Sequence, residues 1–133
     1  MILRTLELPI ELTNNNAGRT QHFGRSASQR KKYERIIRAK FGQQVPLASK
    51  VDIVVQRVLA ARQRLWDSSS VLRGNWKEIE DALVACGFLH DDGPDYVGLC
   101  IGVQDAETRL SSDGGFVRVY FLDCGTLNVG SVI

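Results

Sequence analysis

The chain has 133 residues, 44% of them hydrophobic, and a net charge of +2 that arises from 17 Lys and Arg against 15 Asp and Glu. This size and composition predict a soluble globular domain with a real core, and the near-neutral charge excludes nucleic-acid binding through a global basic field. The apolar runs are too short to cross a bilayer, and the N-terminus lacks a signal peptide's apolar core, so no membrane partner is expected.

The three cysteines, Cys86, Cys100 and Cys124, are widely spaced and odd in number. The chain has no C-x-x-C motif, so neither a zinc site nor a disulfide framework is indicated. We expect reduced thiols among apolar neighbours in a cytoplasmic protein. One domain is expected over residues 1–133, with a core at about 2–122 and a C-terminal tail at 123–133.

The first half of the chain predicts a strand, a loop and a helix. Residues 2–8 form the strand, which Pro9 ends because proline cannot donate to a sheet ladder. Residues 13–25 are rich in Asn and Gly and predict a loop. A helix over 27–41 is predicted, since Ser26 and Gln29 have capping-box spacing. Its buried stripe repeats at helical spacing and comprises Tyr33, Ile36, Ile37 and Phe41.

Basic residues gather on the opposite face of this predicted helix. Lys31, Arg35 and Arg38 fall together there, and the preceding loop adds Arg19 and Arg25. Such a run is usually a solvated helix face. Because the whole protein is close to neutral, a helix face whose charges are nearly all positive also fits a surface that contacts DNA phosphates.

Residues 50–59 predict a long strand that is apolar on both faces and therefore central in the sheet. Arg57, Arg62 and Arg64 follow along its exit toward Asp67, and we expect them to add positive charge there. Positive charge beside carboxylates suits a metal-dependent phosphodiesterase, in which cations hold the DNA backbone.

A second helix is predicted over residues 76–86. Asn75 is a suitable N-cap, with Glu78 three positions later, and Gly87 ends the helix. The core-facing stripe of this helix is Trp76, Ile79, Leu83 and Cys86. Lys77 lies in the first turn, where the helix dipole disfavours a cation, so its position favours a functional use.

Two further strands are predicted at residues 96–104 and 116–122. The turn signal SSDGG between them predicts an antiparallel pair with a longer loop at about 105–113. The resulting order of elements predicts an α/β fold of the α+β type, in which a small mixed sheet of about four strands carries two helices on one face.

Acidic residues flank the second helix. Asp67 precedes it and Asp91 and Asp92 follow it, so they can converge only if the chain folds back at both ends. Converging carboxylates would hold a divalent metal or act as acid and base, whereas isolated ones are ordinary turn residues. A His90–Asp site for a metal or a base is a further alternative.

The chain resembles the RusA-type Holliday-junction resolvases of bacteria and prophages over roughly residues 6–122. The resemblance rests on LELPIELTNNN, on the basic helix SASQRKKYERII, and above all on DALVACGFLHDD at residues 81–92. The family's D-x-D-N motif corresponds to the run from Asp67 to Ser70. The resemblance implies a RusA-like fold, a homodimer, a bacterial or phage-encoded cytoplasmic protein, and four-way DNA junctions as substrate.

Residue by residue, the resemblance implies that Asp67, Lys77 and Asp92 are catalytic. Asp67 and Asp92 would bind Mg²⁺, with Mn²⁺ as a possible substitute. The family's second aspartate is replaced here by Ser69, and its asparagine by Ser70. Weaker metal binding is expected, because a hydroxyl brings no negative charge. The site could be slow, could recruit Asp91 or Asp95, or could be inactive.

Two main functions follow as expectations. The first is a Mg²⁺-dependent endonuclease that resolves four-way junctions, with DNA gripped by Arg19, Arg25, Lys31, Arg35, Arg38 and Arg64. The alternative is a RusA-like protein that binds branched DNA without cutting it, motivated by the serines at 69 and 70. A third possibility is an interaction protein that has lost both activities.

Overall fold

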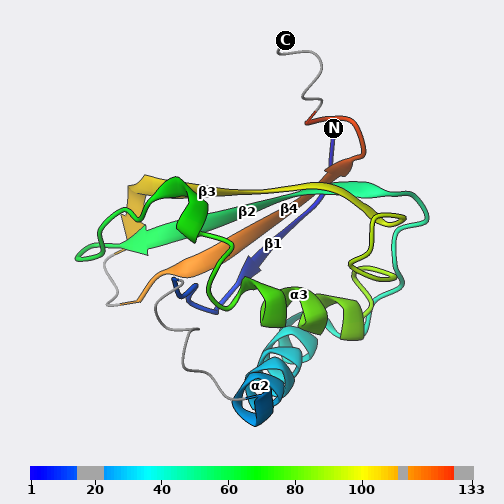
Figure 1. Ribbon diagram of the computed structural model, residues 1–133, viewed down its shortest axis with the longest axis horizontal. Helices are drawn as coiled ribbons and strands as arrows, with labels where there is room; N and C mark the ends of the chain where they lie inside the picture. Colours follow the sequence, from blue (N-terminus) through cyan, green and yellow to red (C-terminus); the bar gives the residue numbers. More distant parts are fainter. Residues whose placement is uncertain (15–22, 111–113, 128–133) are drawn as a thin grey trace.

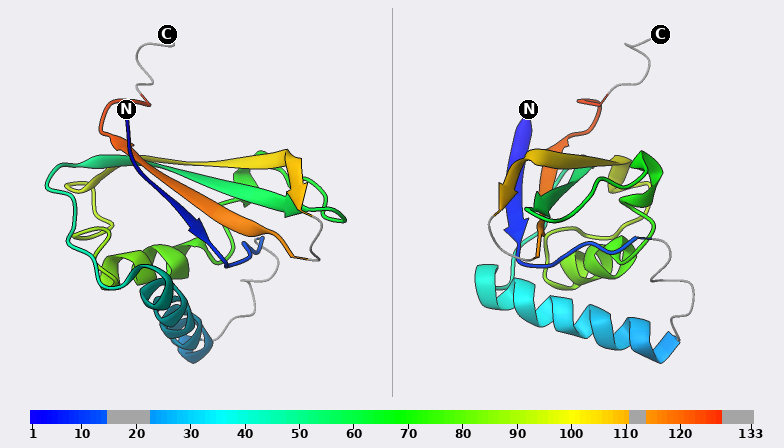
Figure 2. Two further views of the ribbon diagram at one scale, coloured as in Figure 1. Left: turned by 180° about the vertical axis from the view of Figure 1, so that it is seen from behind. Right: turned by 90° about the vertical axis from the view of Figure 1, so that its left-hand side faces the viewer.

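The computed structural model describes residues 1–14, 23–110 and 114–127. Its elements are β1 (Ile2–Leu8), α2 (Phe23–Phe41), β2 (Val51–Ala60), a 3₁₀ turn η1 (Ser68–Ser70), α3 (Trp76–Ala85), β3 (Val97–Leu110) and β4 (Phe116–Asp123). The four strands form a mixed sheet, and both helices cover one face of it (Figures 1 and 2). The predicted α+β class with a small mixed sheet and two helices is therefore confirmed.

The sheet has the strand order β1-β4-β2-β3, which places β2 in its interior as predicted. The predicted antiparallel pairing of the last two strands is wrong. β3 pairs parallel with β2, whereas β4 lies antiparallel between β1 and β2. Parallel neighbours need a crossover, and α3 supplies it between β2 and β3. β3 also extends to Leu110, so Asp105 lies in a strand and not in a loop.

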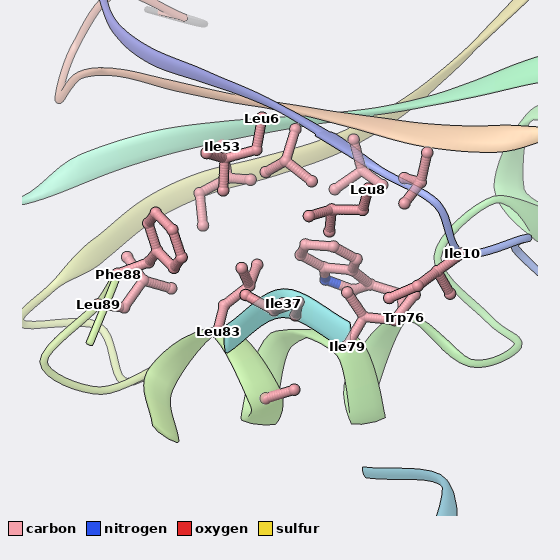
Figure 3. Packing of buried hydrophobic residues seen from close by; sticks show 14 of the residues in the cluster. Leu6, Leu8, Ile10, Ile37, Ile53, Trp76, Ile79, Leu83, Phe88 and Leu89 are labelled. Carbon is pink, nitrogen blue, oxygen red and sulfur yellow. The ribbon is translucent and has the colours of Figure 1, made fainter. Parts of the chain in front are cut away.

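The core lies between the sheet and the two helices, and Figure 3 shows side chains from both layers meeting there. The predicted stripe of α3 is buried. Tyr33 and Ile37 of α2 are buried too, while Ile36 and Phe41 pack at the edge of the core. Helical spacing therefore identified the buried faces correctly, because side chains three and four positions apart share one side of a helix.

The capping box predicted at Ser26 is wrong, whereas Asn75 stands at the N-cap position of α3 as predicted, without the side-chain bond of a cap. α2 begins at Phe23, so Ser26 lies inside the helix, where its hydroxyl donates to Glu78 Oε1 at 2.5 Å. Asn75 precedes α3 but makes no side-chain cap. Its buried amide instead accepts from Thr13 N at 2.8 Å and donates to Tyr33 Oη at 2.9 Å. Long-range partners replace the local cap at each position, because burial demands that these polar groups be paired.

No helix in the described part of the chain is both long enough and apolar enough to cross a membrane.

Candidate functional site

Lys77 is the centre of a charged cluster on the surface of α3. Its ammonium group contacts the Asp92 carboxylate, lies 3.2 Å from Asp81 Oδ1 and lies 3.9 Å from Glu80 Oε1. Glu80 and Asp81 share the face of Lys77 because they follow it by three and four positions on the helix. We call Lys77, Glu80, Asp81, Asp91 and Asp92 the Lys77 cluster.

Asp92 reaches Lys77 because the chain reverses after α3. Gly87 allows the reversal with φ of +88°, and an added Cβ there would lie 2.0 Å from the Gln44 carbonyl oxygen. Phe88 and Leu89 are then buried against the core. The connection runs back along α3 and brings Asp92 to a residue fifteen positions earlier, while Asp91 Oδ1 accepts from Asp92 N at 2.8 Å.

The cluster sets the charge states of its members. The hydrogen bond from Lys77 lowers the pKa of Asp92, and the same contact, with that to Asp81, raises the pKa of Lys77. Lys77 is therefore cationic and already paired at physiological pH. Burial raises the pKa of Glu80 to about 7. The negative charges of Asp92 and Asp81 add to this rise, whereas the positive charge of Lys77 and a hydrogen bond with Trp76 oppose it. Glu80 can therefore bind or release a proton near neutral pH.

Asp67 is not joined to this cluster by any interaction in the part of the chain that the structure describes. It precedes η1, where its carbonyl accepts from Ser70 N at 2.9 Å, and its side chain is exposed and does not cap the turn. No contact in the described chain joins it to Lys77 or Asp92. Ser69 is also exposed, in η1 itself. The structure thus brings together Lys77, Asp91 and Asp92 of the predicted site, but not Asp67 or Ser69.

The donor set for a metal is correspondingly incomplete. Within residues 1–14, 23–110 and 114–127, no group of three or more His, Cys, Asp or Glu side chains could hold a metal ion. Asp92 already accepts from Lys77. Asp95 is exposed, and His90 packs against Tyr96 with ring centroids 5.1 Å apart. These residues do not fit the Mg²⁺ that the resemblance implies.

The predicted DNA-binding residues fall into three groups. Lys31 and Arg35 are exposed on α2, and Arg64 is exposed on the β2–η1 connection. Arg38 is exposed too, but it donates to the Ala85 carbonyl at 3.3 Å and so ties α2 to the end of α3. Arg19 and the side chain of Arg25 lie outside the described residues.

Arg57 was expected, with Arg62 and Arg64, to add positive charge toward Asp67, but it is buried in β2. It is only 4% exposed, and its guanidinium lies 3.5 Å from the centroid of the Trp66 ring. It donates to the Arg64 carbonyl and to Gln104 Oε1, both at 2.9 Å. Val55 and Leu59, two positions to either side on the same face of the strand, were the available sequence signal for burial.

Sequence reasoning also missed Glu80 and Asp52. Glu80 could have been found from its three-residue spacing to Lys77. Asp52 is 1% exposed and accepts three backbone N–H bonds, from Leu99, Gly125 and Leu127. Its donors come from distant segments, which no local pattern reveals.

Comparison of the chain with protein-family models and with curated proteins finds no match. The relation to the RusA-type resolvases therefore rests on the sequence resemblance.

Proposed function

We propose that this chain is a RusA-like protein that recognises branched DNA, with the Lys77 cluster beside the bound strands. The observation that carries the proposal is the contact between Lys77 and Asp92. The resemblance selects these two residues as parts of one site, although fifteen positions separate them. Their contact supports the assignment, since Lys77 on α3 and Asp92 beyond the helix meet only because the chain reverses after α3.

The exposed face of α2 supplies the phosphate contacts. Lys31, Lys32 and Arg35 point to solvent, and the described chain provides none of them with an ion pair. α2 packs against α3 through the Ser26–Glu78 hydrogen bond and through Arg38. The basic face is thus held on the helix pair that carries the Lys77 cluster. Exposed cations on a rigid helix contact DNA phosphates without selecting sequence.

Binding without cutting is the function that this geometry supports best. Lys77 is already neutralised by Asp92 and Asp81, and Asp67 makes no hydrogen bond or ion pair with these residues in the described chain. A homodimer of such domains would match the two-fold symmetry of a four-way junction.

The second candidate is Mg²⁺-dependent resolution of the junction, as in the family that the chain resembles. This candidate rests on the resemblance, which assigns Lys77 and Asp92 to cleavage. The two candidates share DNA recognition and differ only in whether a phosphodiester bond is hydrolysed.

A labelled four-way junction and a linear duplex of matched sequence test both candidates. Binding is measured in EDTA, and nicking is measured separately with Mg²⁺ or Mn²⁺. We expect preferential junction binding, weakened about tenfold in Lys31→Gln/Arg35→Gln because phosphate contacts are lost. Lys50→Gln, at an exposed lysine outside α2, is the matched control and should bind like wild type.

Nicking decides between the candidates. Paired symmetric nicks that disappear in Asp92→Asn would establish the resolvase, whereas tight binding with no nicks would establish the non-cutting protein. Equal affinity for junction and duplex would refute the proposed function altogether.

A further inference from the structure

The connection between β2 and η1 carries a large apolar side chain in an unusual setting. Leu65 is 60% exposed and stands directly after the exposed Arg64. Arg62, two positions earlier, is exposed as well. Figure 1 shows this connection projecting beyond the end of the sheet, before the chain returns to η1.

Leu65 is exposed although its flanking backbone is held firmly. On one side, the buried Arg57 donates to the Arg64 carbonyl at 2.9 Å. On the other side, the Gln104 side chain makes two hydrogen bonds with the Trp66 backbone. It accepts from the backbone N–H at 3.0 Å and donates to the carbonyl at 2.9 Å. Arg57 also covers the Trp66 ring. The projecting side chain is therefore presented by a fixed backbone.

The start of the connection is held in the same way. Gln63 Oε1 accepts from Ala60 N at 2.8 Å, and Gln63 N donates to the Ala60 carbonyl at 3.2 Å. The side chains of Arg62, Arg64 and Leu65 remain directed to solvent. Arg62 and Arg64 flank the apolar side chain of Leu65 along the connection, while Asp105 and Glu107 of β3 line a hollow on its other side. An apolar side chain with cations on one side matches a ligand that combines stacked planar groups with negative charge on that same side. Nucleic acid is that ligand, since its base steps accept apolar wedges and its phosphates bind arginine.

We propose that residues 62–65 form a branch-point wedge, in which Leu65 inserts between base pairs at the junction while Arg62 and Arg64 bind the flanking phosphates. The inference rests on the proposed recognition of branched DNA and adds the element that distinguishes a branch from a continuous duplex. Bases at a branch are already partly unstacked, so inserting a side chain there costs less than it does in a duplex.

The test uses a four-way junction with 2-aminopurine next to the branch, whose fluorescence rises when the base unstacks. Wild type should raise the fluorescence on binding. Leu65→Ala should abolish the rise and weaken junction binding about tenfold, while duplex affinity stays within about twofold. Leu65→Met, which keeps an apolar side chain of similar reach, should restore both signals.

Val45→Ala is the matched control, because Val45 is 83% exposed on a different connection. It should behave like wild type. Arg62→Gln and Arg64→Gln should each weaken junction and duplex binding together and reduce the slope of log affinity against log salt by about 1.

Leu65→Ala that keeps the fluorescence rise, or that weakens duplex binding equally, would overturn the wedge. The proposed function survives that result if the variant still prefers the junction. Wild-type protein with no junction preference would overturn both.

Discussion

Asp52→Asn tests how strongly one buried carboxylate holds the end of the sheet together. Asp52 lies in β2, and its oxygens accept from Leu99 N at 2.9 Å, Gly125 N at 3.0 Å and Leu127 N at 3.2 Å. The three donors come from β3 and from the chain after β4. The carboxylate therefore joins segments that are far apart in sequence at the end of the sheet where the chain begins.

The expected loss follows from these contacts. A hydrogen bond to a charged group contributes about 1.5–3 kcal/mol. The donors are partly buried, so water can replace some of the lost bonds, and the asparagine oxygen retains part of the rest. We expect the free energy of unfolding to fall by about 2–4 kcal/mol, a large fraction of the stability of a domain this size.

The effect should depend on pH in a defined direction. Burial opposes the charge on Asp52, but the N–H bonds from Leu99, Leu127 and Gly125 outweigh burial and lower its pKa. A lowered pKa means that the carboxylate stabilises the fold above the ordinary pKa of about 3.9 and loses this effect as pH falls through the folded-state value. The difference between wild type and Asp52→Asn should therefore be full at pH 7 and shrink below about pH 4.

Urea unfolding followed by tryptophan fluorescence at several pH values measures this difference. Asp95→Asn, at an exposed aspartate, is the control and should change stability by less than about 0.5 kcal/mol. A loss at Asp52 no larger than that of the control, or one that persists unchanged at pH 3, would refute the reasoning.

Three further changes probe the site and its supports. Glu80→Gln should stabilise the protein by about 1–3 kcal/mol at pH 8 and not at pH 4. The carboxyl of Glu80, whose pKa in the folded protein is raised to about 7, opposes folding once it ionises, and the substitution removes this cost. Unfolding curves at the two pH values decide this. Arg57→Met should cost about 1–3 kcal/mol in urea unfolding, since it leaves partly buried partners such as the Arg64 carbonyl unpaired, and a loss below about 0.5 kcal/mol would contradict that role. Gly87→Ala should cost more than about 1 kcal/mol, because φ is positive and a Cβ would strike the Gln44 carbonyl; an unchanged melting temperature would be the contrary result.

Local patterns predicted the elements and the buried faces well. The apolar stripe of α3 and the doubly apolar β2 were both identified, because backbone geometry dictates which residues share a face. The cap at Ser26 was not, and Asn75 takes the N-cap position without the capping bond, since the side chains of both residues pair with other elements. The pairing of β3 and β4 was also wrong, because a turn signal between two strands does not decide which neighbours they take in a sheet.

The candidate site was likewise only partly predictable from the sequence. The resemblance placed Lys77 and Asp92 in one site, and the chain reversal after α3 brings them into contact. The sequence alone could not tell that Asp67 makes no contact with them in the described chain, since that depends on the path of the β2–α3 connection.

By itself, the sequence determined the helices, the strands and their buried faces, because these follow from periodicity within a few residues. Only the tertiary structure decided which polar residues are buried. Asp52 accepts from donors 47, 73 and 75 positions away, and Arg57 reaches Gln104 across 47. A polar residue in a strand can be buried only where distant groups satisfy its hydrogen bonds, so its burial is a property of the assembled fold.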